Sequence, residues 1–231
     1  MVSCIHLYRC YEFPCNAMKK PRQKSGGGLS RRVRFPEDEA RLTWLPLLLD
    51  AYALIDTGVA IAVRNGEKER GTGIACSRGC AVCCGQKDIP VYPHELVGLY
   101  WYASEKFGLP GRQVLKEQLA GRRPGSPCPF LVQNACSVHP VRPAACRWFN
   151  IFGTSCGPGE DPYYTRRADV LVPIEDYTDR AFSAVLVFYK VKKSDDLTRA
   201  LRLVRSQIMN LQTYDWSKLL DTMEKGTALE P

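Results

Sequence analysis

Cysteines constrain this chain more than any other residue type. Eight of the eleven lie between residues 76 and 156, and four of these fall within nine residues. The first group is Cys76-x3-Cys80-x2-Cys83-Cys84, and the second group contains Cys128, Cys136 and Cys146, followed by Cys156. The other three, Cys4, Cys10 and Cys15, are close to the N-terminus, and we interpret them as incidental. So dense a group is better explained by chemistry, such as metal binding, disulfide bonding or redox activity, than by core packing alone.

Metal binding is the favoured explanation among these three. The first 35 residues lack the apolar run of 7–15 residues that a secretory signal requires, so we expect the cytoplasm, where disulfides are uncommon. A redox dithiol formed by Cys80 and Cys83 lacks the βαβ context of a thioredoxin fold. Neither alternative is excluded by the sequence.

The spacing of the first group brings its thiols together in either of two local structures. On an α-helix, all four would lie within a sector of about 100°. In a loop, Cys80 and Cys83 would still form a metal knuckle, and Gly79 and Gly85 favour a loop or a very short helix. In the second group, Cys146 follows Pro143 in a predicted first helical turn, between Arg142 and Arg147, which favour a thiolate.

The identity of the metal stays open between zinc and iron, including an iron–sulfur cluster. The sequence has neither the ferredoxin run Cys-x2-Cys-x2-Cys-x3-Cys nor a paired Cys-x2-Cys ribbon. Seven or eight thiols exceed the needs of one tetrahedral ion, so two metals, or one metal with spare thiols, both fit. His94 and His139 are candidate extra ligands, although a surface or capping role is simpler for both. Asp88 and Glu95 are interpreted as surface or capping residues, with support of the ligands as the alternative.

The chain divides into a predicted disordered basic tail, residues 1–35, and a single helical domain, residues 36–231. The tail carries seven of the eight net positive charges and a Ser-Gly-Gly-Gly run, so the body is nearly neutral. Met18 is an alternative start, which leaves open whether residues 1–17 are native.

The predicted fold class is mainly α, a helical scaffold around a cysteine-rich irregular metal-binding segment. Apolar residues recur at helical spacing in most of the domain, but not in the segment from 121 to 165, which is rich in Pro, Gly and Cys. Helices are predicted from residue 36 to a stop at Asn65-Gly66, over 93–107, over 112–120, from about 178 with a possible strand at 185–191, and over 194–211. The apolar residues of the helix over 194–211 form an amphipathic stripe, which is expected to lie in the core or at a dimer seam.

Several function classes are disfavoured. No membrane span is predicted, because the most apolar stretch, Thr43 to Val63, carries Asp50 and Asp56. Nucleic-acid binding is unlikely, since the folded body is nearly neutral and does not interleave aromatic with basic residues. Glycine-rich phosphate loops, a Gly-x-Ser-x-Gly elbow, His-Glu-x-x-His and a recognisable S-adenosylmethionine site are absent, so no catalytic residue is identified.

The ordered cysteine motifs resemble a known family. Cys76-x3-Cys80-x2-Cys83-Cys84, Cys-Pro-Phe-Leu at 128–131 and Cys136-Ser-Val-His-Pro-Val-Arg-Pro-Ala-Ala-Cys146-Arg147 are similar to the YkgJ-type, or CxxCxxCC, cysteine-cluster family of bacterial proteins. The resemblance covers residues 75–149 and implies chelation of zinc or iron through Cys76, Cys80, Cys83, Cys84, Cys128, Cys136 and Cys146. His139 replaces the family's usual aromatic residue, and Cys156 lies outside the shared motif.

The sequence thus predicts a metal-binding protein with a structural or redox role. Because some larger relatives with this domain are flagellin lysine methylases, a related metal-dependent enzyme is one alternative, and a zinc-stabilised interaction module is another. The partner expected is a metal ion. A protein partner is left unidentified, and no membrane partner is expected.

Overall fold

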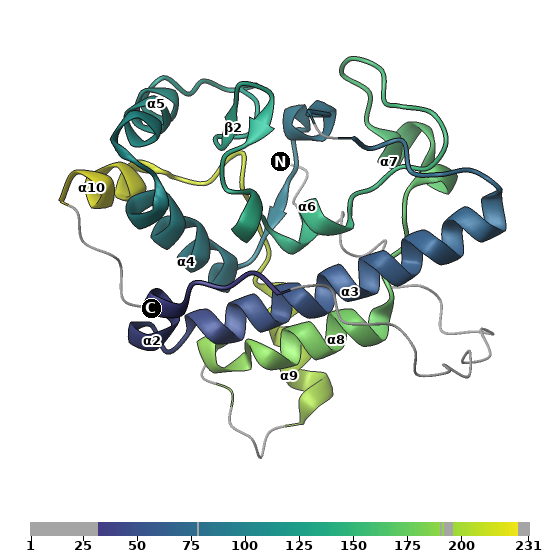
Figure 1. Ribbon diagram of the computed structural model, residues 1–231, viewed down its shortest axis with the longest axis horizontal. Coiled ribbons are helices and arrows are strands. Elements are labelled where there is room, and N and C mark those ends of the chain that lie inside the picture. The colour runs from purple at the N-terminus through teal and green to yellow at the C-terminus, as the bar shows by residue number, and fades with distance from the viewer. Residues whose placement is uncertain (1–31, 78, 190, 192–195, 226–231) are drawn as a thin grey trace.

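The structure, a computed structural model, describes residues 32–77, 79–189, 191 and 196–225 (Figure 1). It is mainly helical, which confirms the predicted fold class. The longer helices are α3 (Leu45–Arg70), α4 (Pro93–Trp101), α5 (Leu109–Ala120), α8 (Glu175–Ala184), α9 (Leu197–Ser206) and α10 (Ser217–Lys225). The shorter ones are α2 (Pro36–Arg41), α6 (Ala144–Trp148) and α7 (Pro162–Thr165), and the strands β1 (Pro90–Val91), β2 (Leu131–Val132), β3 (Ala135–Cys136) and β4 (Met209–Asn210) form two small antiparallel sheets.

Helix α3 is the central element, and α8 runs alongside it (Figure 1). The predicted apolar face is confirmed over its first half, where Leu45, Leu48, Leu49, Tyr52 and Ile55 are buried, whereas its last two residues, Val59 and Ala62, are half-buried. The helix is long and apolar enough to cross a membrane, with a mean hydropathy of 1.6 over its best window. A core helix has the same composition, and α3 packs on α8, α6 and α4, so its apolar side chains are needed for packing within the fold.

The predicted end of this helix at Asn65-Gly66 was wrong. Helix α3 continues to Arg70 and ends at Gly71, whose φ of 66° is the left-handed conformation common after a helix. Gly66 is instead needed for close packing, because a Cβ at this position would lie 2.4 Å from Cζ of Phe152. The absence of a side chain there lets the Phe152 ring lie directly against the helix.

The other N-terminal helices follow the prediction closely. Helix α4 begins at Pro93 and continues as a π-helical turn, η2 (Tyr102–Lys106), so it covers the predicted range 93–107 almost completely. Helix α5 begins at Leu109, earlier than the predicted residue 112, with Pro110 in its first turn. The possible strand at 185–191 is replaced by a 3-10 turn, η5 (Leu186–Tyr189).

The predicted apolar stripe on the C-terminal helix was only partly confirmed. Leu201, Val204 and Leu211 are buried, but α9 ends at Ser206 and Leu197 is exposed. The helix does not reach Leu211 because strand β4 pairs with β1. The Asn210 side chain reinforces this pairing: it accepts the Ile89 backbone N–H and donates to the Lys87 carbonyl. These tertiary hydrogen bonds outweigh the local helical pattern.

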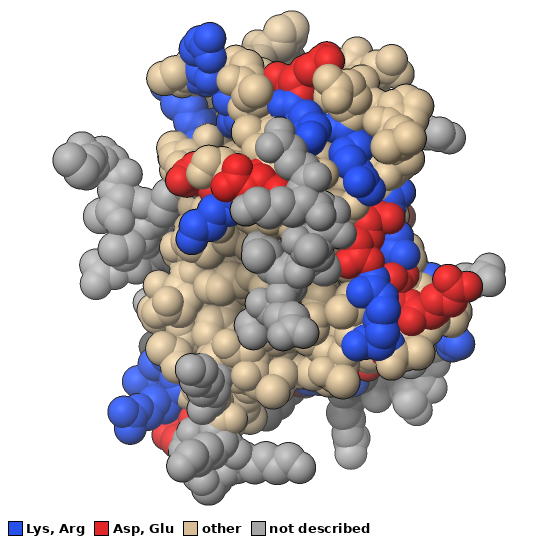
Figure 2. Space-filling view, turned by 90° about the vertical axis from the view of Figure 1, so that its left-hand side faces the viewer, with Lys and Arg blue, Asp and Glu red and all other residues tan. Residues whose placement is uncertain are grey.

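The end of the predicted tail lies against the helical body. The Arg32 guanidinium pairs with Glu39 and Asp50, and the Phe35 ring meets Trp101 edge-on with centroids 5.0 Å apart. Residues 1–31, including Cys4, Cys10 and Cys15, are outside the described residues. On the face of the molecule in Figure 2, basic and acidic side chains are interspersed, in keeping with the nearly neutral body.

Candidate metal centre

The first cysteine group follows an irregular path, with one 3-10 turn, η1 (Val82–Gly85), instead of an α-helix. Before that turn, the chain is held by the segment around residue 151, because the Ala75 N–H donates to the Ile151 carbonyl at 2.7 Å. Gly79 has a φ of 86°, which a side chain would disfavour. The expected loop is therefore present, and the turn places Cys83 and Cys84 next to each other at its centre.

A backbone hydrogen bond joins the two cysteine groups directly. The Cys128 N–H donates to the Cys84 carbonyl at 2.6 Å, across 43 intervening residues. The Gln212 side chain also donates to the Cys84 carbonyl of the first group. The Gln118 side chain donates to the carbonyls of Pro129 and Leu131, which follow Cys128 in the second group. The long loop between the groups is thus closed by backbone and amide hydrogen bonds.

Cys136 is positioned by a hairpin that was not predicted. Strands β2 and β3 pair with Leu131 opposite Cys136, and the turn residues Gln133 and Asn134 have φ values of 49° and 58°. Two consecutive positive φ values are characteristic of a tight hairpin turn. Asn is the one favourable residue of this pair, so the sequence signal for the turn was weak.

Cys146 lies on the short helix α6, which is held by buried charged groups from two longer helices. The Glu95 carboxylate, from α4, accepts the Ala144 N–H at 2.6 Å and the Tyr92 N–H at 2.9 Å. Arg147 donates to Asp56 of α3 at 2.7 Å and to two carbonyls, and its guanidinium lies over the Tyr52 ring. Glu95 and Arg147 are almost completely buried, so both ends of this short helix have fixed positions.

Five thiols form an inner group: Cys83, Cys84, Cys128, Cys136 and Cys146. The Cys84 side chain hydrogen-bonds with those of Cys83 and Cys128. Cys146 is close enough to Cys83, Cys136 and Cys84 for their charges to raise its pKa. These residues come from η1, from the loop in which Cys128 lies between two prolines, from β3 and from α6, so four separate segments converge on one place.

Three further thiols form an outer group at the edge of the first. Cys76 interacts electrostatically with Cys80 and Cys83, and Cys156 interacts with Cys76 and Cys80. Cys80 is exposed, whereas Cys76 and Cys156 are half-buried. None of the eight described cysteines forms a disulfide. Cys156, which the motif left aside, therefore lies beside two members of the predicted ligand set.

The surroundings of these cysteines favour the neutral thiol. A hydrogen bond with Cys128, then burial, raises the pKa of Cys84 to about 12, and a hydrogen bond with Cys84 raises that of Cys83. Burial raises the pKa of Cys76, Cys136 and Cys146. Arg142 acts in the opposite direction, because its positive charge lowers the pKa of Cys76, Cys83 and Cys136.

Among the described residues, neither candidate histidine hydrogen-bonds with a thiol. His94 is not a surface residue: it is buried on α4, its Nδ1 lies 2.7 Å from the Tyr189 hydroxyl, and burial lowers its pKa to about 3. The pKa of His139 is lowered by burial and by Arg142 and Arg147, without any contribution from a cysteine.

The two candidate supporting acids differ from each other. Asp88 is exposed, as expected, and accepts a hydrogen bond from Asn210. Glu95 is the capping residue that was expected, since it closes the N-terminus of α4, but it is also completely buried. Its second contact, with α6, gives no signal in the local sequence.

The chemistry of this donor set fits zinc or iron, because both metals accept several thiolates. Among the described residues, however, no three or more His, Cys, Asp or Glu side chains form a group that could hold a metal ion as they stand. Three of the thiols, those of Cys83, Cys84 and Cys128, form side-chain hydrogen bonds through Cys84, in surroundings that favour the protonated form.

A comparison with family models identifies the segment that carries these thiols. Residues 75–169 match CxxCxxCC, which is described as a putative zinc- or iron-chelating domain. This segment is therefore similar to a CxxCxxCC domain. The CxxCxxCC match confirms the resemblance seen in the motifs and extends it from residue 149 to residue 169, so that Cys156 falls within it. No curated protein and no solved structure matches the chain.

Proposed function

We propose that this protein binds zinc or iron, including the option of an iron–sulfur cluster, and that the metal has a structural or redox role. The proposed ligands are the thiolates of Cys76, Cys80, Cys83, Cys84, Cys128, Cys136 and Cys146. The observation that carries the proposal is the convergence of the five inner thiols from four segments of a CxxCxxCC domain. Free thiols in this number suit a reducing compartment such as the cytoplasm.

The protein's own part in metal binding is to hold backbone segments and to release protons. The Cys84–Cys128 backbone hydrogen bond and the fixed ends of α6 limit how far the thiols must move. Each ligand must become a thiolate, and the metal supplies the positive charge that favours this form. Arg142 contributes in the same direction. We therefore expect metal binding to release protons, and affinity to decrease as the pH falls.

Metal analysis of anaerobically purified protein tests the proposal most directly. Iron with a broad absorption near about 400 nm would identify an iron–sulfur cluster, whereas a colourless protein with stoichiometric zinc would indicate a structural or Lewis-acid site. A purified, folded protein with neither zinc nor iron, and no uptake of either on titration, would refute the proposal.

Cysteine variants test the ligand set. Cys80→Ser and Cys146→Ser should each reduce the metal content per chain, because they remove one proposed ligand from each group. Cys15→Ser is the matched control, and it should leave the metal content unchanged. Full metal content and full stability in Cys146→Ser would show that the two-group site is wrong and would confine the site to residues 76–84.

Removal of the metal should weaken the segment that closes the site. A ligand that binds only the folded state stabilises it, and structural zinc sites contribute on the order of 10 kcal/mol. Chelation should thus lower the melting temperature and increase proteolysis within residues 121–150.

Deletion of residues 1–31 should leave the metal content per chain unchanged. A loss of metal in this variant would identify Cys4, Cys10 or Cys15 as a ligand.

A further inference from the structure

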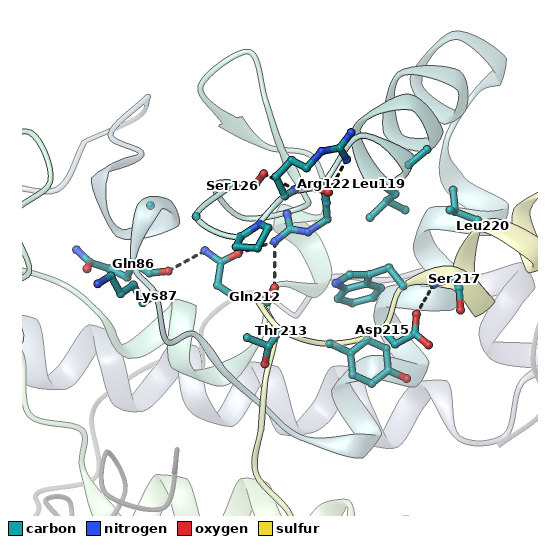
Figure 3. A pocket seen from close by; sticks show the side chains of 17 residues that line it. Gln86, Lys87, Leu119, Arg122, Ser126, Gln212, Thr213, Asp215, Ser217 and Leu220 are labelled. Carbon is teal, nitrogen blue, oxygen red and sulfur yellow. Dashed lines mark hydrogen bonds between the residues drawn. The ribbon is translucent and has the colours of Figure 1, made fainter. Parts of the chain in front are cut away.

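A pocket of about 630 Å³ lies beside the cysteine centre, since Gly85 and Gln86, which directly follow Cys84, are part of its lining (Figure 3). Its walls come from Gly85–Lys87, from the end of α5 and the loop 121–126, and from the connection between β4 and α10. A volume of this size is typical of sites for small organic ligands. The pocket is therefore large enough for more than an ion and its water.

The charged lining of the pocket is mostly basic. Lys87, Arg122 and Arg123 contribute positive charges, and Asp215 is the single acid. Asp215 faces its own helix, where it accepts the Ser217 N–H at 3.0 Å (Figure 3). Among the described residues, no carboxylate forms an ion pair with any of the three cations. The pocket thus has an excess of positive charge without a partner of opposite sign.

Arg122 is the cation that most clearly lacks a counter-charge. It is half-buried, and its guanidinium donates to neutral oxygens: the Pro127 carbonyl at 2.7 Å, and the Gln212 carbonyl and Oε1 at 3.1 and 3.0 Å. Burial lowers its pKa, which reflects the cost of holding this charge away from water. By contrast, the buried Arg147 and the half-buried Arg166 both pair with carboxylates.

Apolar groups form the opposite part of the pocket lining. Leu119 and Leu220 project from α5 and α10, and Trp216 and Tyr214 belong to the connecting segment (Figure 3). A bare inorganic ion would leave the half-buried Tyr214 and Leu220 side chains in contact with water. A ligand with an apolar or aromatic body would cover them, at a gain of about 25 cal/mol for each Å² buried.

We propose that this pocket binds a small organic anion, in which a carboxylate or phosphate group meets Arg122 and an apolar or aromatic body covers Leu220 and Tyr214. Lys87 and Arg123 would contribute longer-range attraction from the rim. This site is distinct from the thiol centre, and the proposal does not depend on metal binding.

The pocket is connected to the cysteine centre by two residues of its wall. Gln212 bonds to Arg122 and also donates to the carbonyls of Cys84 and Gln86. Arg122 donates to the carbonyl of Pro127, which immediately precedes Cys128. Occupation of the pocket should therefore make both cysteine segments more rigid, and hydrogen exchange at residues 84–86 and 127–128 should slow when the ligand is present.

Isothermal titration calorimetry with four probes tests the site. Phenyl phosphate and benzoate carry both an anion and an aromatic body, whereas inorganic phosphate has only the anion and phenol only the body. We expect saturable binding of at least one of the first two in the low millimolar range or tighter, and binding at least about tenfold weaker for phosphate and phenol. Comparing phenyl phosphate with benzoate distinguishes a phosphate site from a carboxylate site.

Variants assign the binding to the pocket. Arg122→Gln removes the charge and should weaken binding by about tenfold or more, while Arg122→Lys should retain part of it. Because Arg122 also supports the fold, Lys87→Gln provides a second test: this exposed residue should weaken binding severalfold without loss of stability. Arg180→Gln is the control, since it removes an equal charge from an exposed ion pair on α8.

Two results would overturn the proposal. The first is an absence of saturable binding of phenyl phosphate and benzoate up to about 10 mM. The second is a Kd for the bound probe that changes no more in Arg122→Gln and Lys87→Gln than in Arg180→Gln. Metal-free protein should also bind the probe, and binding that appears only with metal would place the probe at the cysteine centre and also refute the proposal.

Discussion

Glu95 and His94 are adjacent on α4, and the two side chains should give opposite pH dependences of stability. Burial raises the pKa of Glu95 from 4.5 to about 7 and lowers the pKa of His94 from 6.5 to about 3. Both values differ from those of the unfolded chain, where the side chains are in water. The free energy of unfolding must therefore change with pH wherever one state holds a proton that the other has lost.

The signs follow from proton counting. Between pH 4.5 and 7, folded Glu95 keeps a proton that the unfolded chain has released, so this residue makes stability decrease as the pH rises. Between pH 3 and 6.5, unfolded His94 holds a proton that the folded state excludes, so this residue makes stability increase as the pH rises. Each slope is at most about 1.4 kcal/mol per pH unit. From pH 4.5 to 6.5 the two contributions largely cancel.

Single substitutions should reveal each contribution. In Glu95→Gln, the stability relative to the wild type should rise with pH from 4.5 to 6.5 by up to about 3 kcal/mol, because only the histidine slope is left. In His94→Asn, which keeps a polar partner for the Tyr189 hydroxyl, the relative stability should fall by a similar amount. The measurement is urea unfolding of metal-free protein at several pH values, with wild type and variant compared at each.

Other titrating groups cancel in this comparison, because they are present in both proteins. A difference in unfolding free energy between Glu95→Gln and wild type that stays constant from pH 4.5 to 6.5 would refute the assignment of the raised pKa to Glu95. At pH 4.5, Glu95→Gln should be less stable than the wild type by about 1–3 kcal/mol, since the amide has one accepting oxygen whereas both carboxyl oxygens accept a backbone N–H.

Two substitutions in the scaffold have matched controls. Gly66→Ala should destabilise the protein by about 1–2 kcal/mol, because the new methyl group meets Phe152. Gly111→Ala, which has no close neighbour, should increase the free energy of unfolding by up to about 1 kcal/mol. Equal shifts of the denaturation midpoint in the two variants would contradict this reasoning. Arg147→Gln should cost about 3 kcal/mol in thermal or chemical unfolding, and a loss as small as that of exposed Arg180→Gln, expected below about 0.5 kcal/mol, would show that the ion pair of α6 contributes little.

Periodicity was sufficient to predict α3, α4, α5, α8 and α9 in outline, because each has buried residues at helical spacing, whereas α7 and α10 were not predicted. The stripe from Leu45 to Ile55 on α3 and that from Leu96 on α4 to Ala103 in η2 are examples. Helix ends were harder, since they depend on contacts with distant residues. Gly66 looked like a stop in the sequence, but its role is defined by a ring that lies 86 residues further along the chain.

The centre was predictable in its residues but not in its construction. The clustering of cysteines in two groups, and the family resemblance, identified the thiols. The contacts that hold them were not visible, because they join residues far apart in sequence and use ordinary groups, such as the Cys84 carbonyl and the Glu95 carboxylate. The hairpin that holds Cys136 was missed because Gln133-Asn134 contains no glycine.

The contacts that cross the boundaries of the matched segment limit its modularity. Residues 75–169 coincide with a family unit, yet β1 takes its only strand partner from β4 among the described residues, and Arg147 takes its carboxylate from α3. A fragment cut at 75 and 169 would expose the apolar underside of α4 and leave a buried guanidinium without its counter-ion. We expect such a fragment to be poorly soluble, so grafting this centre into another protein would require α3 and the β4 segment to be transferred with it.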